Sequence, residues 1–286
     1  MNFLYDRGPS TEAGGDKLLK NCRQAENLLD QPPRTWARSA AQLRQRPQLS
    51  CRHCPVRDLA PCGALPGDDG AAVLETFHSP LRHVPAGGTI FEQGEPSDRS
   101  FTVVSGWAAL CQLSSDGRPA ILNFALPGDI LSFERTSKVA TRSAIAVGDA
   151  TVCSISRTRQ ERLEREYPGF DLRHKETAGR DLSMAYENLA RFAFGGAAQR
   201  VAHLSWTLAC RSLRRRPQAS DRTWIPANQI QLALATGLTS VHVSRTLRRL
   251  REASLLTFEN HELAILNPAD VERLAGGSPE SLAGLT

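Results

Sequence analysis

The sequence predicts an α+β fold in which an antiparallel sandwich or barrel comes first, a long helix follows, and a winged helix-turn-helix ends the chain. Three observations predict this order. Glycines interrupt short apolar runs between residues 81 and 156, an apolar stripe with helical spacing runs from 182 to 192, and an arginine-rich pair of helical segments lies between 224 and 250. A length of 286 residues suits two domains with extra segments, since domains typically hold about 100–200 residues.

The composition is ordinary for a soluble protein, with 41% hydrophobic and 23% charged residues. The chain has no apolar run of the roughly 18 residues that a membrane span needs. Its first residues, MNFLYDRGPSTEAGGDKLLK, carry early acidic residues and no apolar signal core, so we expect a cytoplasmic protein. The chain has seven cysteines, an odd number, and a reducing compartment disfavours disulfides. We therefore expect thiolate or metal chemistry rather than structural disulfides.

The first part of the chain divides into an arm and a cysteine-bearing segment. Residues 1–48 are rich in Arg, Gln, Ser and Pro with little apolar periodicity, which predicts a flexible arm. Residues 49–70 carry three cysteines, and residues 71–77 have the spacing of one or two helical turns.

Residues 71–165 are predicted to form the antiparallel β domain. Turn signals every 8–12 residues between short strands are typical of sandwiches and barrels. The clearest strands are expected at Ser100–Val104, Trp107–Leu113, Pro119–Phe124 and Thr151–Ile155.

A long helix is predicted over residues 166–195. Its apolar stripe indicates either ordinary core or a dimer interface. Gly195 and Gly196 interrupt the helix and form a natural hinge, after which helical spacing resumes from Ala197 to about Leu213. The stripe, which we call the seam, consists of Leu182, Ala185, Leu189 and Phe192.

The segment 196–275 contains a helix-turn-helix pattern. A first helix, with Ile230 and Leu234 facing inward, is expected to end at Gly237, and Thr239 is expected to cap the second helix. One face of the second helix carries Val243, Leu247 and Leu250. The opposite face carries the residues that would contact DNA in a major groove: Ser240, Val241, Ser244, Arg245, Arg248 and Arg249.

A small hairpin, the wing, is expected over residues 255–265, and residues 276–286 form a tail. From Gly195 to Phe258, ten arginines stand against Asp221 and Glu252, a local balance of +8 within a net charge of +5. A basic block of this density indicates contact with a polyanion. The alternative is a helical hairpin that only makes protein contacts.

This order of parts resembles the CRP/FNR superfamily of bacterial transcription regulators over residues 51–275. The most specific matches are Gly128-Asp129-Ile130-Leu131, the Gly-Leu-Thr of 237–239 and Val243-Ser244-Arg245. The resemblance implies a β-roll of the jelly-roll, cyclic-nucleotide-binding-like type. It also implies a homodimer formed through the seam, double-stranded DNA with palindromic half-sites, and an activator that works through RNA polymerase.

The cysteine spacing C-x2-C-x7-C is similar to the iron–sulfur variant of the FNR branch. That resemblance implies a [4Fe-4S] cluster that senses oxygen, redox state or nitric oxide, held by Cys51, Cys54, Cys62 and, by its strand context, Cys153. The alternatives that remain are a zinc site built from four cysteines or from three plus His53, a thiol switch, a vestigial cysteine set and a small effector. Cys22, Cys111 and Cys210 are expected to be non-ligands, with Cys22 as a possible substitute.

The sequence departs from the family pattern at Val241, at Ala185 and at the pair Ser132-Phe133. Val241 stands where FNR-type proteins commonly have Glu, and valine can contact only a thymine methyl, so we expect a different half-site. Ala185 stands where an acidic residue often keeps cluster-free FNR monomeric, which suggests that the apoprotein stays dimeric. Ser132 and Phe133 replace the Gly-Glu pair that binds a cyclic nucleotide, which argues against that ligand.

We do not expect an enzyme. The sequence has no nucleotide-binding glycine loop, no nucleophile elbow and no second redox centre. An iron–sulfur or dithiol oxidoreductase that uses Cys51 and Cys54 is the remote alternative.

Overall fold

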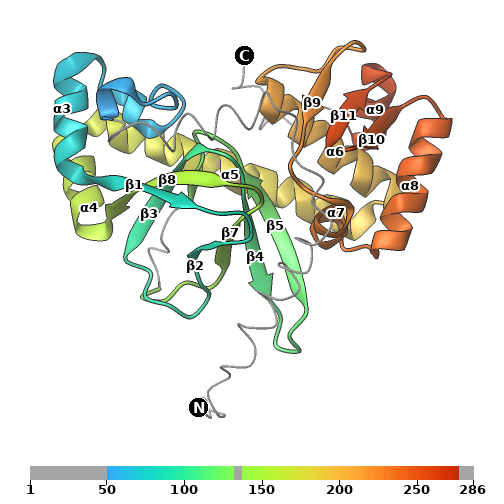
Figure 1. The fold of residues 1–286 in the computed structure, drawn as a ribbon, viewed down its shortest axis with the longest axis horizontal. Coiled ribbons are helices and arrows are strands. Elements are labelled where there is room, and N and C mark those ends of the chain that lie inside the picture. Colours follow the sequence, from blue (N-terminus) through green and yellow to red (C-terminus); the bar gives the residue numbers. More distant parts are fainter. Residues whose placement is uncertain (1–49, 132–136, 277–286) are drawn as a thin grey trace.

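The structure is a computed structural model that describes residues 50–131 and 137–276 (Figure 1). The predicted arm, nearly all of the tail and the pair Ser132-Phe133 lie outside these ranges. The described chain begins with two short 3₁₀ turns, η2 (Cys51–His53) and η3 (Pro61–Ala64). They lead into helix α3 (Gly67–Phe77), which begins earlier and is longer than the one or two turns predicted.

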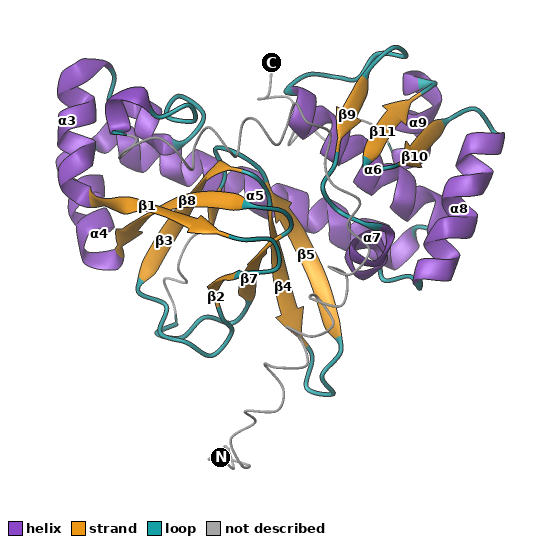
Figure 2. Cartoon of the chain, viewed as in Figure 1, coloured by secondary structure: helices purple, strands orange, loops and turns teal. Residues whose placement is uncertain are grey.

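The β-roll consists, within the described residues, of two four-stranded sheets with the orders β1-β8-β3-β6 and β2-β7-β4-β5. All strand pairs are antiparallel, and Val103, Ala144 and Val152 are buried in an apolar cluster of the roll (Figure 2). The strands are β1 (His78–Val84), β2 (Thr89–Phe91), β3 (Arg99–Ser105), β4 (Ala108–Leu113), β5 (Pro119–Ala125), β6 (Ile130–Leu131), β7 (Ser143–Ala146) and β8 (Ala150–Ser156).

Each of the four strands expected from glycine spacing is present, within one residue of its predicted ends. Gly106 shows why the spacing works. It turns the chain between β3 and β4 with φ +73°, and a Cβ atom there would lie 2.2 Å from the carbonyl oxygen of Asp149. Only glycine fits such a turn without displacing the neighbouring strand.

Three helices connect the roll to the C-terminal domain. Helix α4 (Arg157–Glu166) is followed at once by the long helix α5 (Pro168–Phe194), which runs behind the roll (Figure 1). The predicted glycine interruption is present, and helix α6 (Ala197–Leu213) starts after it.

The C-terminal domain is a winged helix-turn-helix. It contains a three-stranded sheet in the order β10-β11-β9, of which β9 is a strand that the sequence pattern did not predict. Ile230 is 39% exposed, so its predicted inward orientation is wrong; Leu232, Ala233 and Thr236 are the buried residues of α7. The elements are β9 (Arg222–Trp224), α7 (Gln229–Thr236), α8 (Ser240–Glu252), β10 (Leu256–Glu259), β11 (Glu262–Ile265) and α9 (Pro268–Ala275).

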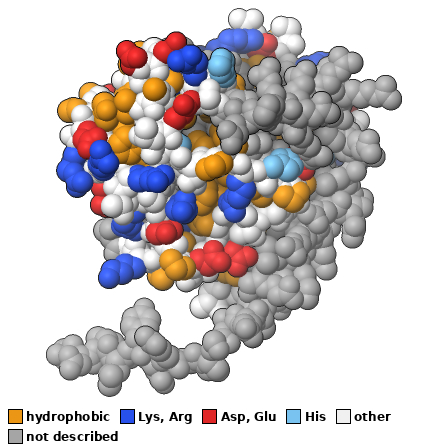
Figure 3. All heavy atoms as spheres, turned by 60° about the vertical axis from the view of Figure 1, so that its left-hand side comes forward, with side chains coloured by type: hydrophobic (Ala, Val, Ile, Leu, Met, Phe, Trp, Pro, Cys, Tyr) orange, Lys and Arg blue, Asp and Glu red, His pale blue; other side chains and the backbone are white. Residues whose placement is uncertain are grey.

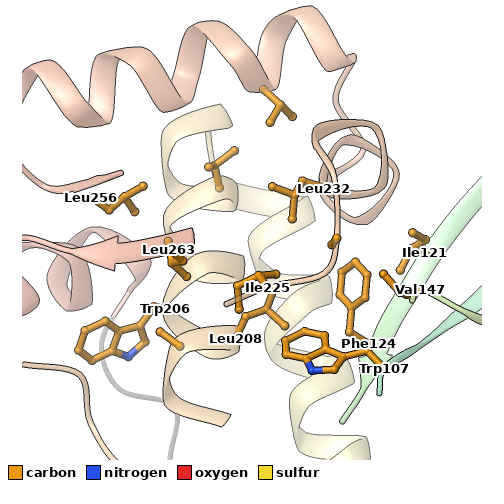
Figure 4. Close-up of a cluster of buried hydrophobic side chains, with 14 of the residues drawn as sticks. Trp107, Ile121, Phe124, Val147, Trp206, Leu208, Ile225, Leu232, Leu256 and Leu263 are labelled. Carbon is orange, nitrogen blue, oxygen red and sulfur yellow. The ribbon is translucent and has the colours of Figure 1, made fainter. Parts of the chain in front are cut away.

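One apolar core spans both domains (Figure 4). Trp107 and Phe124 from the β-roll lie beside Leu208 of α6 and Ile225, which precedes α7. The C-terminal domain is therefore docked on the roll rather than tethered to it. Among the described helices, none has both the length and the apolar character needed to cross a membrane.

Candidate nucleic-acid interface and cysteine site

The position of helix α8 is fixed at its first turn. Gly237 ends α7 in the left-handed conformation with φ +65°, as predicted. Thr239 then caps α8, because its Oγ1 accepts a hydrogen bond from the backbone N–H of His242 at 3.2 Å. Val243, Leu247 and Leu250 face the domain core and are at most 6% exposed. The opposite face of α8 is therefore held outward.

All six predicted contact residues are exposed on this outward face, as is His242. Two arginines of α8 already have acidic neighbours. Arg248 Nε donates to Glu252 Oε1 at 2.8 Å, and Arg251 donates to Glu259. Arg245 and Arg249 have no ion pair within residues 50–131 and 137–276, so their guanidinium groups are available to an incoming anion.

Ion pairs also reduce the positive charge that the sequence assigned to this region. Outside α8, Arg215 pairs with Asp221, Arg216 with Glu272 and Arg222 with Glu262. Because these pairs neutralise charge locally, the field of the domain is weaker than its count of ten arginines suggests. Among the four arginines of α8, Arg245 and Arg249 have no ion pair with a described residue.

The wing is a tight hairpin whose turn residues Asn260 and His261 both have positive φ, the geometry favoured in two-residue hairpins. His261 Nδ1 lies 3.2 Å from the carbonyl oxygen of Ile225, and its ring lies 6.0 Å from that of Trp224. These contacts fix the wing to the segment before α7.

The seam residues of α5 are exposed in the single chain. Leu182 is 53%, Leu189 63% and Phe192 41% exposed, and Ala185 is exposed as well. The same helix carries two more exposed aromatic side chains that the heptad pattern missed. Tyr186 is 63% exposed and Phe194 is 90% exposed. An exposed apolar face of this size indicates a protein contact.

A hollow of about 690 Å³ lies between this helix and the β-roll. Its walls include Leu131, Arg142 and Asp181 together with the seam residues. The residues expected to exclude a cyclic nucleotide, Ser132 and Phe133, lie outside the described chain.

The N-terminal cysteine segment folds against the far end of the β-roll. Cys51 and Cys62 border an apolar cluster of Leu65, Leu74 and Phe77 with Ile155 of β8. Cys153 alternates with Val152, whose side chain faces the inside of the roll, and so it shares the outer face with Ile155. On the visible part of this end, basic and acidic side chains are interspersed (Figure 3).

The four predicted ligands lie near one another. Burial, with smaller contributions from the neighbouring Cys153 and Cys54, raises the pKa of the Cys51 thiol to about 12. Burial and then Cys54 raise the pKa of Cys153 to about 11, and burial followed by the other three thiols raises the pKa of Cys62. Burial therefore favours the protonated thiols, and a bound metal would require them to lose their protons.

The donor set therefore fits a soft metal or cluster in residue type. Within the described residues, no three cysteine, histidine or acidic side chains yet stand at metal-holding distances. Cys111 and Cys210 are 1% and 3% exposed in the core elsewhere, as expected for non-ligands.

One neighbour of the thiols was not predicted. His78 Nε2 lies 3.9 Å from Cys62 Sγ, while Nδ1 faces the Leu74 carbonyl oxygen at 3.0 Å. Burial lowers the pKa of His78, which keeps the imidazole neutral. His53, the histidine that the sequence suggested, is exposed, with its Nδ1 3.1 Å from Ser50 Oγ. The sequence did not mark His78, because it follows α3 and lies outside the spacing pattern of the cysteines.

Comparison with known proteins places both domains. Residues 81–167 match the cyclic nucleotide-binding domain family, and residues 199–274 match the Crp-like helix-turn-helix domain family. The chain is 32% identical over 228 residues to the nitrogen fixation regulation protein FixK of Bradyrhizobium diazoefficiens, a match that covers 79% of this chain and 93% of that protein.

Two further matches agree. The transcriptional activatory protein AadR of Rhodopseudomonas palustris is 31% identical over 226 residues, which cover 78% of this chain and 92% of AadR. The solved structure of FixK2 from Bradyrhizobium japonicum superimposes with a TM-score of 0.61 at 23% identity, over 69% of this chain and 98% of that one. The structural likeness supports the fold.

Proposed function

The chain belongs to the CRP/FNR family of DNA-binding transcription regulators, and on that premise we propose that it is a homodimeric activator that senses oxygen or redox state through its cysteines. It would act in the cytoplasm on a palindromic promoter site, in contact with RNA polymerase, as a regulator rather than an enzyme. The observation that carries the sensing part is the packing of the segment with Cys51, Cys54 and Cys62 against the face of β8 that carries Cys153.

DNA reading is assigned to the outward face of α8. Arg245 and Arg249 are free to bind a guanine edge or a phosphate, while Ser240 and Ser244 offer short hydroxyls near the helix start. Val241, 58% exposed, can contact only an apolar group such as a thymine methyl. We therefore propose a half-site that differs from one read by a glutamate at this position.

Dimerisation is assigned to the seam. In a two-fold dimer the same apolar strip meets itself, so Leu182, Ala185, Leu189 and Phe192 would be covered by their counterparts. Covering this strip also places the two α8 helices as a pair, which two half-sites require.

A [4Fe-4S] cluster held by the four cysteines is the cofactor that we propose. When bound, it supplies iron–sulfur bonds that oxygen or nitric oxide can attack. The protein's own part is to hold the thiols together: Arg57 Nη2 donates to the Gly67 carbonyl oxygen at 2.7 Å, and Arg173 of α5 donates to the Asp58 carbonyl oxygen. Both contacts fix the loop between Cys54 and Cys62.

Zinc is the second candidate. The observation that favours it is the imidazole of His78 beside Cys62, because zinc accepts mixed thiolate and imidazole ligands. Metal analysis distinguishes the two cofactors. A zinc site would contain zinc and no sulfide, whereas a [4Fe-4S] cluster would contain iron and sulfide.

The test is anaerobic purification followed by iron, sulfide and zinc analysis and DNA binding to a palindromic duplex. We expect a brown protein with about four irons and four sulfides per chain, whose DNA affinity falls after exposure to air. Cys153→Ser should lose the iron, whereas the buried Cys111→Ser control should keep it. Colourless protein with the same DNA affinity in air would overturn the sensing proposal, and binding that does not weaken with salt would overturn DNA reading.

A further inference from the structure

The turn between β5 and β6, Leu126–Asp129, is held from two sides. On one side it touches the cysteine segment through Leu59, and on the other it touches helix α6 through Arg211. The turn is thus a single short piece of chain that contacts both the cysteine segment and the DNA-binding domain.

Arg211 is the contact from the DNA-binding domain. It is 9% exposed, and its Nη1 donates to the Phe124 carbonyl oxygen at 2.8 Å while its Nη2 donates to the Asp129 carboxylate. The same carboxylate accepts the backbone N–H of Leu126 at 2.7 Å, which closes the turn. A buried guanidinium that loses its carboxylate is costly, so the position of Arg211 and that of Asp129 are linked.

Leu59 is the contact from the cysteine segment. Gly128 has φ +99°, and a Cβ atom on it would lie 2.7 Å from Leu59 Cβ. The backbone of the turn therefore rests directly against the Leu59 side chain. Leu59 itself belongs to the segment between Cys54 and Cys62, where its N–H donates to the Val56 carbonyl oxygen at 3.1 Å.

A second connection reaches the turn through β3. Gly128 N–H donates to the Val103 carbonyl oxygen at 2.8 Å, and Val103 N–H donates to the Asp129 carbonyl oxygen at 3.0 Å. The preceding residue, Thr102, is the register partner of Cys153. Strand β3 therefore connects the position of Cys153 to Asp129, independently of Leu59.

We propose that Arg211 is a positioning residue, and that the turn transmits displacement of the cysteine segment through Asp129 to α6 without passing through the seam of α5. The regulatory meaning of this link rests on the proposed function, but the link itself does not require a bound metal. The competing route runs from the cysteine segment into α5, through Arg173 and the Asp58 carbonyl oxygen.

The experiment is hydrogen–deuterium exchange on the full chain, reduced, free of metal and free of DNA. Leu59→Ala trims the side chain that supports Gly128, Arg211→Met removes the guanidinium at similar length, and the double variant combines them. Leu172→Ala, a 60% exposed leucine on α5, is the matched control. If Arg211→Met does not fold, Arg211→Lys replaces it, since it keeps the charge but not the paired donors.

We expect Leu59→Ala to speed exchange over residues 208–215 by about 2- to 30-fold, with no such change from Leu172→Ala. In the Arg211→Met background, Leu59→Ala should add nothing over 208–215. The inference is overturned if Leu59→Ala leaves 208–215 unchanged, acts equally in both backgrounds, or changes only 168–194. Because no iron or DNA is present, this result is independent of the iron analysis that tests the proposed function.

Discussion

Phe192 of α5 lies directly against Gly237, the residue that ends α7: a Cβ atom on Gly237 would lie 2.8 Å from Cε1 of that ring. The seam and the turn of the helix-turn-helix thus meet at this contact. Arg200 of α6 covers the same ring, with its guanidinium carbon 5.2 Å from the ring centroid. A displacement of Phe192 would therefore also displace Gly237, which lies just before the start of α8.

Gly237→Ala tests this contact. The new methyl group meets the Phe192 ring, and the left-handed backbone adds its own strain, so we expect the free energy of unfolding to fall by about 2–3 kcal/mol. Gly117→Ala is the control, since Gly117 has a similar φ of +78° with nothing within 4 Å of a new Cβ atom. Urea unfolding measures both. Equal losses in the two variants would show that the contact with Phe192 adds no cost.

Arg249→Ala and Arg248→Ala should differ although the residues are neighbours. Arg249 is unpaired on the exposed face and Arg248 is already bound to Glu252, so the first variant should lower DNA affinity and flatten its salt dependence much more than the second. Arg245→Ala should instead cost about 1–3 kcal/mol at one base pair and relax specificity there. Titrations of a labelled duplex at several salt concentrations measure these effects. Equal salt slopes for the two neighbouring variants would contradict the role given to the ion pair.

Ala185→Asp should convert the dimer to monomers. In a seam that meets itself, two carboxylates would face each other in an apolar contact, whereas the wild-type alanine adds no repulsion. Sedimentation velocity measures the change, and Ser183→Asp, an exposed position outside the seam, places the same charge on the same helix as a control. We expect metal-free wild-type protein to remain dimeric. Clean monomers of that protein in air would contradict the expectation drawn from Ala185.

His203 should make the protein less stable in acid. Burial lowers its pKa to about 4 from an ordinary 6.5, with Arg191 adding to the effect, and its Nε2 lies 3.1 Å from Asn188 Oδ1. The folded chain keeps this imidazole neutral while the unfolded chain takes up a proton below pH 6.5. Stability should therefore fall between pH 6.5 and 4, by up to about 3 kcal/mol from this group alone.

His203→Gln keeps the donor to Asn188 and removes the titration. Urea unfolding at pH 7 and pH 4.5 should show a larger loss for wild type than for this variant. An identical loss in the two proteins would exclude His203 as the source.

The sequence predicted the helix ends correctly where a local backbone requirement selects the residue type. Gly237 and Thr239 end and start their helices as expected, because a left-handed cap and a hydroxyl cap are local requirements. Patterns that depend on partners were harder. In α7, Ile230 and Leu234 share one face, while the face that is buried carries Leu232, Ala233 and Thr236. Leu234 is still partly buried against the core, so the prediction fails at Ile230, and the packing of α7 against α6, α8 and β5 decides which face is buried.

Partners distant in sequence account for the other differences. Strand β9 has three residues and exists because Thr223 pairs with Leu263 of the wing. The pair Arg211–Asp129 joins positions that are 82 residues apart, and the imidazole beside Cys62 comes from His78 at the end of α3. No local motif marks these contacts, since each arises when separate elements fold together.

The apolar core shared by Trp107, Phe124, Leu208 and Ile225 has a consequence for folding. The β-roll and the C-terminal domain complete each other's interior, so neither can lose its order without exposing side chains of the other. The chain is therefore expected to unfold in a single cooperative step, with the β-roll and the DNA-binding domain sharing one melting temperature. A substitution in this shared core changes the packing of both domains, so the evolution of one domain is constrained by the other. The stability of the regulator therefore depends on the same surface that positions its DNA-binding helix.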